Sequence, residues 1–375
     1  MMRLPLILSL YIGRHFILSV LTVLGIMLLI IGLIELLELV RRASDAPHPV
    51  PFLIIIEMCL LKLPTTAEKI YPFSFLIGGM VTLSRLTRTS ELVVARAAGV
   101  SVWQFLMPGI ITALLMGLVF VGIINPIAAA TVSRYERLEG KYISGLASTL
   151  SISPSGLWLR QVGESNIQFQ DTLADEYILH ALRMDQGNLM LQHVIIFLYQ
   201  KERGFVGRID ADNAVLGPGQ WAVHHAVLSR PGMTPMSISE YIMPTQLTLN
   251  QIQDSFSAPE TFSFWALPGF IHVLEKAGFS ALRHRLHFYS LMAMPMLFAG
   301  MLMLAAVFSL RQTRRGRTGM MVVAGVVSGF VLYFLTNLIY AMGAAGTLPI
   351  GLAAWAPSLI VVAVAGAALL HLEDG

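Results

Sequence analysis

Long stretches of the chain carry no charged residue, and their lengths give the first indication of structure. Phe16–Ile34 has nineteen residues without a charge, enough to cross a hydrocarbon core of about 30 Å as a helix. Thr318–Leu372 is long enough for two such helices, with a hairpin at "GAAGTLPIG" (Gly343–Gly351) between them. Three more uncharged stretches are Ile70–Ser84, Ala97–Ser133 and Leu286–Leu310. The pattern therefore predicts six membrane-spanning helices.

A separate short helix is expected before the second span. "FLIIIEMCLLKL" (Phe52–Leu63) has only twelve residues, two of them charged, which is too short to span and favours an interfacial helix. Pro64 is expected to end that helix. The uncharged stretch after it is also short, so the second span must begin near Thr65.

Between the third and fourth spans the pattern changes to short segments rich in Val, Ile, Leu and aromatic residues. Turn signals such as "DQGN", "GPGQ" and "RPGM" separate them at roughly ten-residue spacing. This spacing predicts a β-sandwich or jelly-roll domain. The expected segments are "GLWLRQV", "NIQFQD", "YILHALRM", "NLMLQHVIIFLYQ", "RIDADNAVL", "QWAVHHAVLSR" and "SISEYIMPTQLTL". The fold class is therefore a membrane α-helical protein: three helices in residues 1–133, a β-jelly-roll in 134–262 and three helices in 263–375.

Composition supports a chain that lies mostly in lipid. Of its 375 residues 55% are hydrophobic and only 13% are charged, against about 25% in soluble domains. Its basic excess rests mainly on arginine, which favours lipid headgroups or a membrane-side partner over nucleic acid. Cys59 is the single cysteine, so an internal disulfide is excluded.

Orientation is not decided by counting arginines and lysines on the two sides, because the two counts are equal. The densest basic cluster, "RQTRRGR" (Arg311–Arg317), favours an internal N-terminus with the β domain outside.

Several catalytic motifs are missing from the sequence. It has no phosphate loop of the form G-x-x-x-x-G-K-[ST], no G-x-S-x-G elbow and no H-E-x-x-H. His284 and His287 have a spacing that could suit a metal, although histidines at the start of a span need no such role. We therefore expect no cofactor on this chain and no ATP hydrolysis by it.

Charges cluster where the first span ends. Glu35 and Glu38 lie one helical turn apart, and Arg41 and Arg42 follow Glu38 at pairing distance. One interpretation is an interfacial cluster that ends the span. The other is a cavity that handles an amphipathic substrate with a charged headgroup. In that second case the groups that would meet phosphate or carboxylate are Arg41, Arg42, Lys62 and Lys69.

A short charged helix is predicted inside "SRLTRTSELVVARAAGVSVWQF" (Ser84–Phe105). Thr89 and Ser90 are good N-cap residues, Glu91 suits a first turn, and Gly99 suits the end of the helix. The helix is either a solvated linker or a docking helix that transmits force from a soluble partner into the membrane.

The sequence "YPFSFLIGGMVTLSRLTRTSELVVARAAGVS" (Tyr71–Ser101) closely resembles the signature of the LptF/LptG family, the permeases of the lipopolysaccharide export ABC transporter. The layout of three spans, a β-jelly-roll and three spans matches as well, so the resemblance covers essentially the whole chain. "LPLILSLYIGRHFILSVL", "SPSGLWLR" and "GFVLYFLTNLIYAMG" resemble the LptG member more than LptF.

The resemblance implies a set of partners and site residues. The partners are an LptF-like permease, a dimer of the cytoplasmic LptB-like ATPase that uses ATP and Mg²⁺, and an LptC-like single-span protein. It implies a cytoplasmic N-terminus and a periplasmic β domain in the inner membrane of a Gram-negative bacterium. The ATPase-coupling helix would lie at about residues 85–99, with coupling residues Arg88, Ser90, Glu91, Leu92, Arg96, Ala98 and Gly99. The substrate cavity would use Glu35, Glu38, Arg41, Arg42, Lys62 and Lys69, and a lateral gate would use Phe330, Phe334 and Asn337. Asn337 is also a candidate for a hydrogen bond between helices.

The chain departs from the family at two positions. Glu35 and Thr65 stand where related LptG proteins have lysines that meet lipid A phosphates. This suggests that the substrate has fewer or differently placed phosphates, or that Lys62 and Lys69 make the contact instead.

Two other functions stay open. An ion-driven secondary transporter would use Glu35, Glu38 and Glu68 as proton carriers. A membrane-anchored assembly or scaffold protein would bind its partners through the β domain alone. Of the three candidate functions, only the ABC transporter requires the short charged helix.

Overall fold

A computed structural model describes residues 6–46, 49–97, 99–143, 157–169, 172–185, 190–200, 204–217, 219–245, 258–276, 280–310 and 318–374. The chain divides into two compact units. The helical unit comprises Met1–Glu136, Pro259–Leu267 and Leu282–Gly375, and the second unit comprises Arg137–Ala258 and Pro268–Ala281. The expected cluster Arg311–Arg317 lies outside the described residues.

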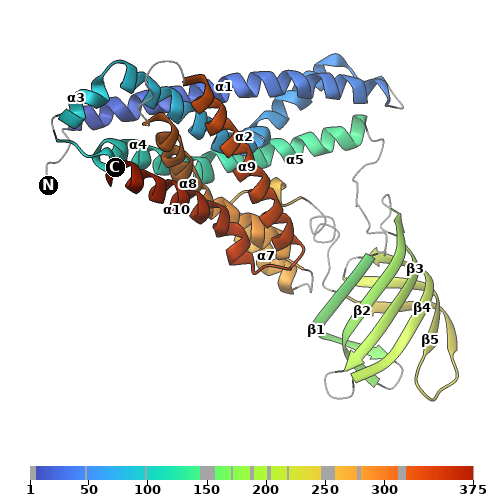
Figure 1. Cartoon of the computed structure of the whole chain (residues 1–375). Helices are drawn as coiled ribbons and strands as arrows, with labels where there is room; N and C mark the ends of the chain where they lie inside the picture. The colour runs from blue at the N-terminus through green and yellow to red at the C-terminus, as the bar shows by residue number, and fades with distance from the viewer. Residues whose placement is uncertain are drawn as a thin grey trace. The chain divides into compact units, whose positions relative to one another are not determined.

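Helices make up most of the described residues outside the inserted strands (Figure 1). They are α1 (Leu6–Ser44), α2 (Phe52–Arg88), α3 (Glu91–Ala97), α4 (Val102–Val119), the π-helical turn η1 (Phe120–Ile124), α5 (Asn125–Tyr142), the 3-10 turn η2 (Pro259–Thr261), α7 (Leu267–Lys276), α8 (Leu282–Ser309), α9 (Thr318–Ala344) and α10 (Ile350–Asp374). Within the described part of the chain, 5 helical stretches are long and apolar enough to cross a membrane: Ser9–Ser44, Val102–Tyr142, Leu282–Ser309, Val323–Ala344 and Ile350–His371. α2 is not among them, so the count of six spans stays a prediction.

α2 corrects the expectation of a separate interfacial helix before the second span. It is one continuous helix of 37 residues, with Pro64 and Pro72 inside it, so Pro64 does not end a short interfacial helix. A proline removes one backbone donor from a helix, so Pro64 cannot donate to the carbonyl four residues earlier, that of Leu60. Beside Pro64, the Thr66 hydroxyl donates to the Lys62 carbonyl at 3.1 Å, and the Thr65 hydroxyl lies 3.4 Å from the Ala128 carbonyl of α5.

α8 lies at the centre of the helical unit, where it packs against α2, α4 and α10. Its Phe298 ring is fully buried and stacks on Phe75 of α2, with ring centroids 4.5 Å apart. Tyr71 of α2 and Phe120 of η1 complete the cluster around the same ring. Four aromatic rings from three segments distant in sequence thus fix the centre of the bundle.

Glycines allow two close helix contacts. A Cβ added at Gly117 of α4 would lie 2.4 Å from the Cα of Pro295 in α8, and one at Gly78 of α2 would lie 2.8 Å from the Cα of Val20 in α1. In a membrane the hydrophobic effect does not drive helices together, so their association depends on close packing. Small residues permit the close backbone approach that this packing requires. Gly25 of α1, by contrast, has open space around its Cα.

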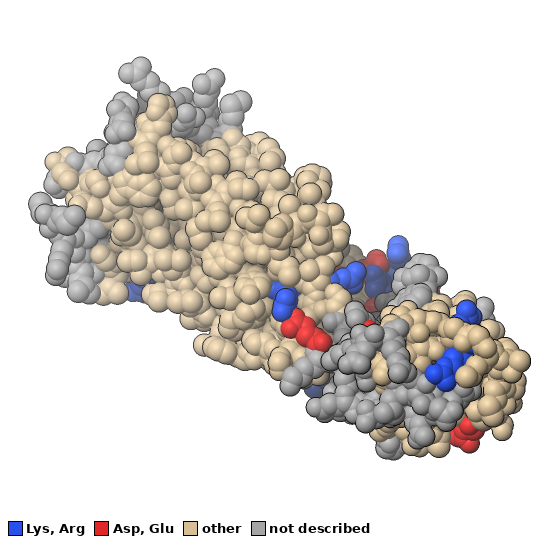
Figure 2. Space-filling model, turned by 90° about the horizontal axis from the view of Figure 1, so that it is seen from below, with Lys and Arg blue, Asp and Glu red and all other residues tan. Residues whose placement is uncertain are grey.

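The surface of the helical unit is apolar over wide areas. Figure 2 shows a broad face of it almost without Lys, Arg, Asp or Glu. In α1 and α9 only 11% of the most apolar stretch is buried, against 67% in α8. α1 and α9 therefore present long apolar faces, such as Leu29, Leu33 and Leu37, to lipid or to another chain.

The second unit is built on a single antiparallel sheet of six strands in the order β1-β2-β3-β4-β5-β6 (Figure 1). The strands are β1 (Leu157–Phe169), β2 (Thr172–Asp185), β3 (Met190–Gln200), β4 (Gly204–Gly217), β5 (Gln220–Ser229) and β6 (Met236–Pro244). The inserted β domain is confirmed, and its described strands form a meander, whereas a jelly roll connects two sheets through Greek keys. The first two expected segments form one strand, β1, with a register shift between Val162 and Ile167.

One face of this sheet holds the core of the second unit. Residues alternate between buried and partly exposed along β3 and β5, as period-2 side-chain direction requires. Trp221 and Tyr177 are the largest fully buried side chains there. The Tyr177 hydroxyl donates to the Thr245 Oγ1 at 3.2 Å, and burial raises the pKa of Tyr177 to about 12.

Candidate functional site

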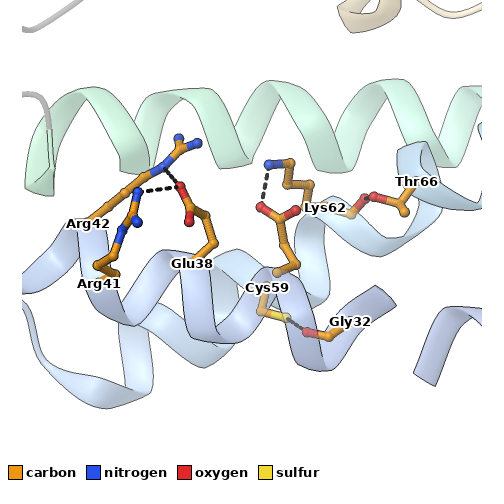
Figure 3. Close-up of polar contacts among 8 residues, drawn as sticks. Gly32, Glu38, Arg41, Arg42, Cys59, Lys62 and Thr66 are labelled. Carbon is orange, nitrogen blue, oxygen red and sulfur yellow. Dashed lines mark hydrogen bonds and ion pairs between the residues drawn. The ribbon is translucent and has the colours of Figure 1, made fainter. Parts of the chain in front are cut away.

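The charged residues predicted at the end of the first span come together on two neighbouring helices. α1 and α2 pack side by side and are joined by a short connection, so residues 27 apart in sequence can meet. Lys62 of α2 makes an ion pair with Glu35 of α1. Figure 3 shows Lys62 on α2 near Glu38, Arg41 and Arg42 on α1. One turn further along α1, Glu38 accepts a hydrogen bond from Arg42 at 3.0 Å and pairs with Arg41 at 3.6 Å. Five of the six expected cavity residues thus form one polar cluster.

α5 covers part of this cluster. The Lys62 ammonium lies 5.1 Å from the centre of the Tyr135 ring, a cation–π distance. Arg134, the residue before, pairs with Glu57 of α2. These contacts of Tyr135, Arg134 and Glu57 were not foreseen, because nothing local in the sequence shows that α5 runs beside α2.

The electrostatics of the cluster separate its cations into two kinds. The Lys62 and Glu35 side chains are only 29% and 20% exposed and neutralise each other. The Arg41 side chain is 74% exposed and shares the single carboxylate of Glu38 with Arg42. A phosphate approaching from outside would therefore meet Arg41 and Arg42 before Lys62. A role for Lys62 in binding phosphate would first require opening its pair with Glu35.

Lys69 does not join this cluster. It lies two turns further along α2, where it lines a separate cavity of about 220 Å³ together with Glu68 and Asn337. Glu68, expected as a proton carrier beside Glu35 and Glu38, is therefore apart from both.

The short charged helix exists, but it is shorter than expected. Arg85 and Arg88 belong to α2, and only Glu91–Ala97 forms the separate helix α3. Ser90 has φ 61°, so it forms a kink between α2 and α3 and does not take the extended conformation of an N-cap. Gly99 has φ 83°, as expected of a glycine that follows the end of a helix. Ala98 lies outside the described residues, as does the side chain of Arg96.

Glu91 is positioned by two other residues. The Thr89 hydroxyl lies 2.9 Å from its carboxylate, and the Tyr11 hydroxyl of α1 lies 3.4 Å from the same oxygen. Leu92 next to it is buried and anchors the helix, while Val94 is exposed. α3 thus presents one held carboxylate at the turn between two long helices. The contribution of Tyr11 has no sequence signal, since it stands 80 residues away.

The three residues expected at a lateral gate all lie on α9. Phe330 and Phe334 are 61% and 72% exposed, and the Phe330 ring lies 5.4 Å from that of Phe73 on α2. The Asn337 amide donates to the Tyr333 carbonyl within α9 at 3.0 Å, and not to another helix as expected. A polar side chain in a helix can donate a hydrogen bond to a backbone carbonyl of the preceding turn, so it does not require a partner on a neighbouring helix.

Within the part of the chain that the structure describes, no group of three or more His, Cys, Asp or Glu side chains could hold a metal ion. His284 and His287 are both buried on α8.

Comparison with known proteins identifies the family of the chain. The family model for the lipopolysaccharide export system permease LptF/LptG matches residues 10–371. The chain is 23% identical over 309 residues to the lipopolysaccharide export system permease protein LptG of Haemophilus influenzae, covering 80% of this chain and 81% of that protein. It is 25% identical over 286 residues to LptG of Escherichia coli K12, covering 74% of this chain and 75% of that protein. With its apolar helices and inserted β domain, the chain belongs to the LptF/LptG family of lipopolysaccharide export permeases, multi-pass proteins of the bacterial inner membrane.

Proposed function

We propose that this chain is the LptG-like permease of an ABC transporter that takes lipopolysaccharide from the inner membrane and passes it to a periplasmic bridge toward the outer membrane. The observation that carries this proposal is α3, a short helix between two long ones, with the carboxylate of Glu91 held by Thr89 and Tyr11. A carboxylate held in this way is suited to charge-assisted hydrogen bonds with a partner. In this proposal α3 is the coupling helix, and the end of the helical unit that carries it is cytoplasmic.

The energy source is a separate protein. The sequence has no phosphate loop, so ATP and Mg²⁺ would be used by an LptB-like ATPase dimer that receives α3. This chain would bind no cofactor and catalyse no reaction itself.

The largely exposed faces of α1 and α9 support a second permease beside this one. An apolar helix face can be covered by lipid or by another chain, and Phe330 and Phe334 would then lie where the two permeases meet. We propose an LptF-like protein as this partner and an LptC-like single-span protein as the start of the bridge. The substrate would enter between the permeases, with Arg41 and Arg42 as its first cationic contacts.

Co-purification from native membranes tests the proposal. The tagged chain should bring an ATPase and a second multi-pass permease with it. Glu91→Ala should reduce the amount of ATPase recovered, while Glu240→Ala, at an exposed position of β6, should leave it unchanged. Thr89→Val keeps the carboxylate of Glu91 but removes one of the two hydroxyl groups that hold it, so it should give an intermediate loss.

Recovery of the chain alone, or equal ATPase recovery with Glu91→Ala and Glu240→Ala, would contradict the coupling role. A transport activity that persists without any ATPase and stops when the proton gradient is removed would favour the ion-driven alternative.

A further inference from the structure

An aromatic girdle lies on the helical unit where the chain enters α8. It consists of Phe264, Trp265, Phe288 and Tyr289. The rings of Phe264 and Phe288 stack with their centroids 5.1 Å apart, and Trp265 and Tyr289 flank this pair. Trp265 is 69% exposed and Tyr289 is 39% exposed. The girdle therefore presents two side chains with an apolar body and a polar tip on the surface.

Two hydrogen bonds fasten the girdle to the end of α4. The indole Nε1–H of Trp265 donates to the Gly122 carbonyl in the π-helical turn η1 at 3.1 Å. The backbone N–H of Phe264 donates to the Asn125 Oδ1 at 2.8 Å. Because the one donor of the indole is already paired, its exposed ring can lie against hydrocarbon without an unsatisfied polar group.

Helix lengths place a membrane surface at the girdle. A rise of about 1.5 Å per residue puts Gly122 about 30 Å from Val102, the first residue of α4. It also puts Tyr289 about 30 Å from Ser309, the last residue of α8. A hydrocarbon core is about 30 Å thick, and neither stretch contains a charged residue. Both helices are thus expected to cross the core over these stretches.

The two stretches end at the same level. A Cβ added at Gly109 of α4 would lie 3.1 Å from Leu302 of α8, and one at Gly117 would lie 2.4 Å from Pro295. Residue numbers therefore rise along α4 as they fall along α8, so the two helices are antiparallel neighbours. The girdle lies where both stretches end, since Trp265 contacts Gly122 and Phe264 stacks on Phe288.

Polarity changes across the girdle in the direction that a membrane surface requires. On one side Leu118 of α4 and Met292 of α8 are exposed apolar residues, 61% and 42% accessible. On the other side the first turn of α8 carries Arg283 and Arg285. Trp and Tyr are enriched at membrane surfaces, where a ring can face hydrocarbon beside polar headgroups.

We propose that the aromatic girdle lies at the boundary between the hydrocarbon and the headgroups of the bilayer, and that it sets the depth of the helical unit there. Trp265 is its main contact with lipid. Lipid covers this surface, because the girdle continues the exposed apolar faces of two helices of membrane-spanning length. The placement depends on no particular substrate or partner of the permease, so it can fail while the proposed function holds.

Fluorescence quenching by brominated lipids tests the position of Trp265. The purified protein, in whatever complex it forms, is reconstituted into phosphatidylcholine vesicles with bromine near either the headgroup end or the methyl end of the acyl chains. The contribution of Trp265 is the fluorescence that Trp265→Phe removes. We expect bromine near the headgroup end to quench this contribution more strongly. Trp221→Phe, which removes a fully buried ring of the second unit, should not change the intensity that bromine quenches.

Two results of this experiment would overturn the proposal. If neither bromine position quenches the contribution of Trp265, the indole faces water or protein. If bromine near the methyl end quenches it more strongly, the girdle lies deep inside the bilayer.

A matched pair of lysine substitutions tests the same boundary without changing the girdle. Ile111 and Ile127 are 51% and 52% exposed. Ile111 lies about 16 Å before Gly122, near the middle of the predicted core, and Ile127 lies about 8 Å beyond it. Ile111→Lys should lower the amount of protein inserted into the membrane, because a charge at the centre of a span is costly. Ile127→Lys should leave that amount unchanged, because its ammonium can reach the headgroups.

Equal results for the two lysine variants would contradict the placement. If both lower insertion, the hydrocarbon extends past Ile127 and the boundary is not at the girdle. If neither does, α4 does not face lipid over the predicted stretch.

Discussion

Replacing Glu35 with glutamine should weaken the contact between α1 and α2 more than any other single loss of charge on α1. The change keeps the size of the side chain and removes only its charge. Lys62 would then lose its ion-pair partner, although it would keep its position over the Tyr135 ring. An unpaired, partly desolvated ammonium raises the free energy of the folded state.

The size of the effect follows from the exposure of the two side chains. Breaking a fully buried ion pair by removing one partner costs about 3–5 kcal/mol, whereas an exposed pair contributes about 0–1 kcal/mol. Glu35 and Lys62 are 20% and 29% exposed, between these limits. We therefore expect Glu35→Gln to lower the free energy of unfolding by about 2 kcal/mol.

A double-mutant cycle measures this in mixed micelles, with unfolding followed as the fraction of denaturing detergent is raised. The variants are Glu35→Gln, Lys62→Gln and the two together. The double variant should lose less stability than the sum of the single losses, because removal of both charges leaves no unpaired group. Glu38→Gln is the control, since it lies one turn away on the same helix and pairs with exposed arginines. If Glu35→Gln and Glu38→Gln have the same small effect, the ion pair does not hold α1 to α2.

Three further outcomes are expected. Gly117→Ala should lower the free energy of unfolding by about 1–3 kcal/mol, because the added methyl group meets the backbone of α8. Gly25→Ala, the control, should be neutral or slightly stabilising, because the position is open. Equal effects of the two variants in the same unfolding assay would contradict the close contact. Asn125→Ala should cost about 1–3 kcal/mol, because the backbone N–H of Phe264 loses the acceptor that it now contacts at 2.8 Å, and an unchanged free energy of unfolding would argue against this bond. The pKa of Tyr177, about 12 in the folded chain, exceeds the value of about 10 in an unfolded one, so its contribution to stability is complete below pH 10 and is lost as the pH rises through 12. Unfolding at alkaline pH can be followed by tryptophan fluorescence. The loss of folded signal as the pH rises should be shallower for Tyr177→Phe than for the unchanged protein, and identical pH profiles of the two would refute this.

The sequence by itself determined where most of the membrane-length helices and strands lie. Uncharged stretches of sufficient length predicted α1, α8, α9 and α10. The length of an apolar stretch is a local property of the sequence, and it decides whether a helix can cross the hydrocarbon core. Alternating apolar residues between turn signals gave the strands. The residues of α3 were also recognisable, since the signature that carries them is contiguous in sequence.

The tertiary structure alone decided which residues meet. Pro64 was expected to end a helix, yet α2 continues through it as one helix that packs against α1 and α8. Six cavity residues were expected together, but Lys69 lies in another cavity with Glu260 and His287.

The pairs Glu35–Lys62, Tyr11–Glu91 and Asn125–Phe264 join residues 27, 80 and 139 positions apart. Such pairs depend on how each helix is rotated about its axis and how far it slides along its neighbour. Close contacts such as that of Gly117 with Pro295 set both quantities, and they arise only when the whole bundle packs. Local hydrophobicity predicts which stretches form membrane-length helices, whereas packing decides which of their side chains meet.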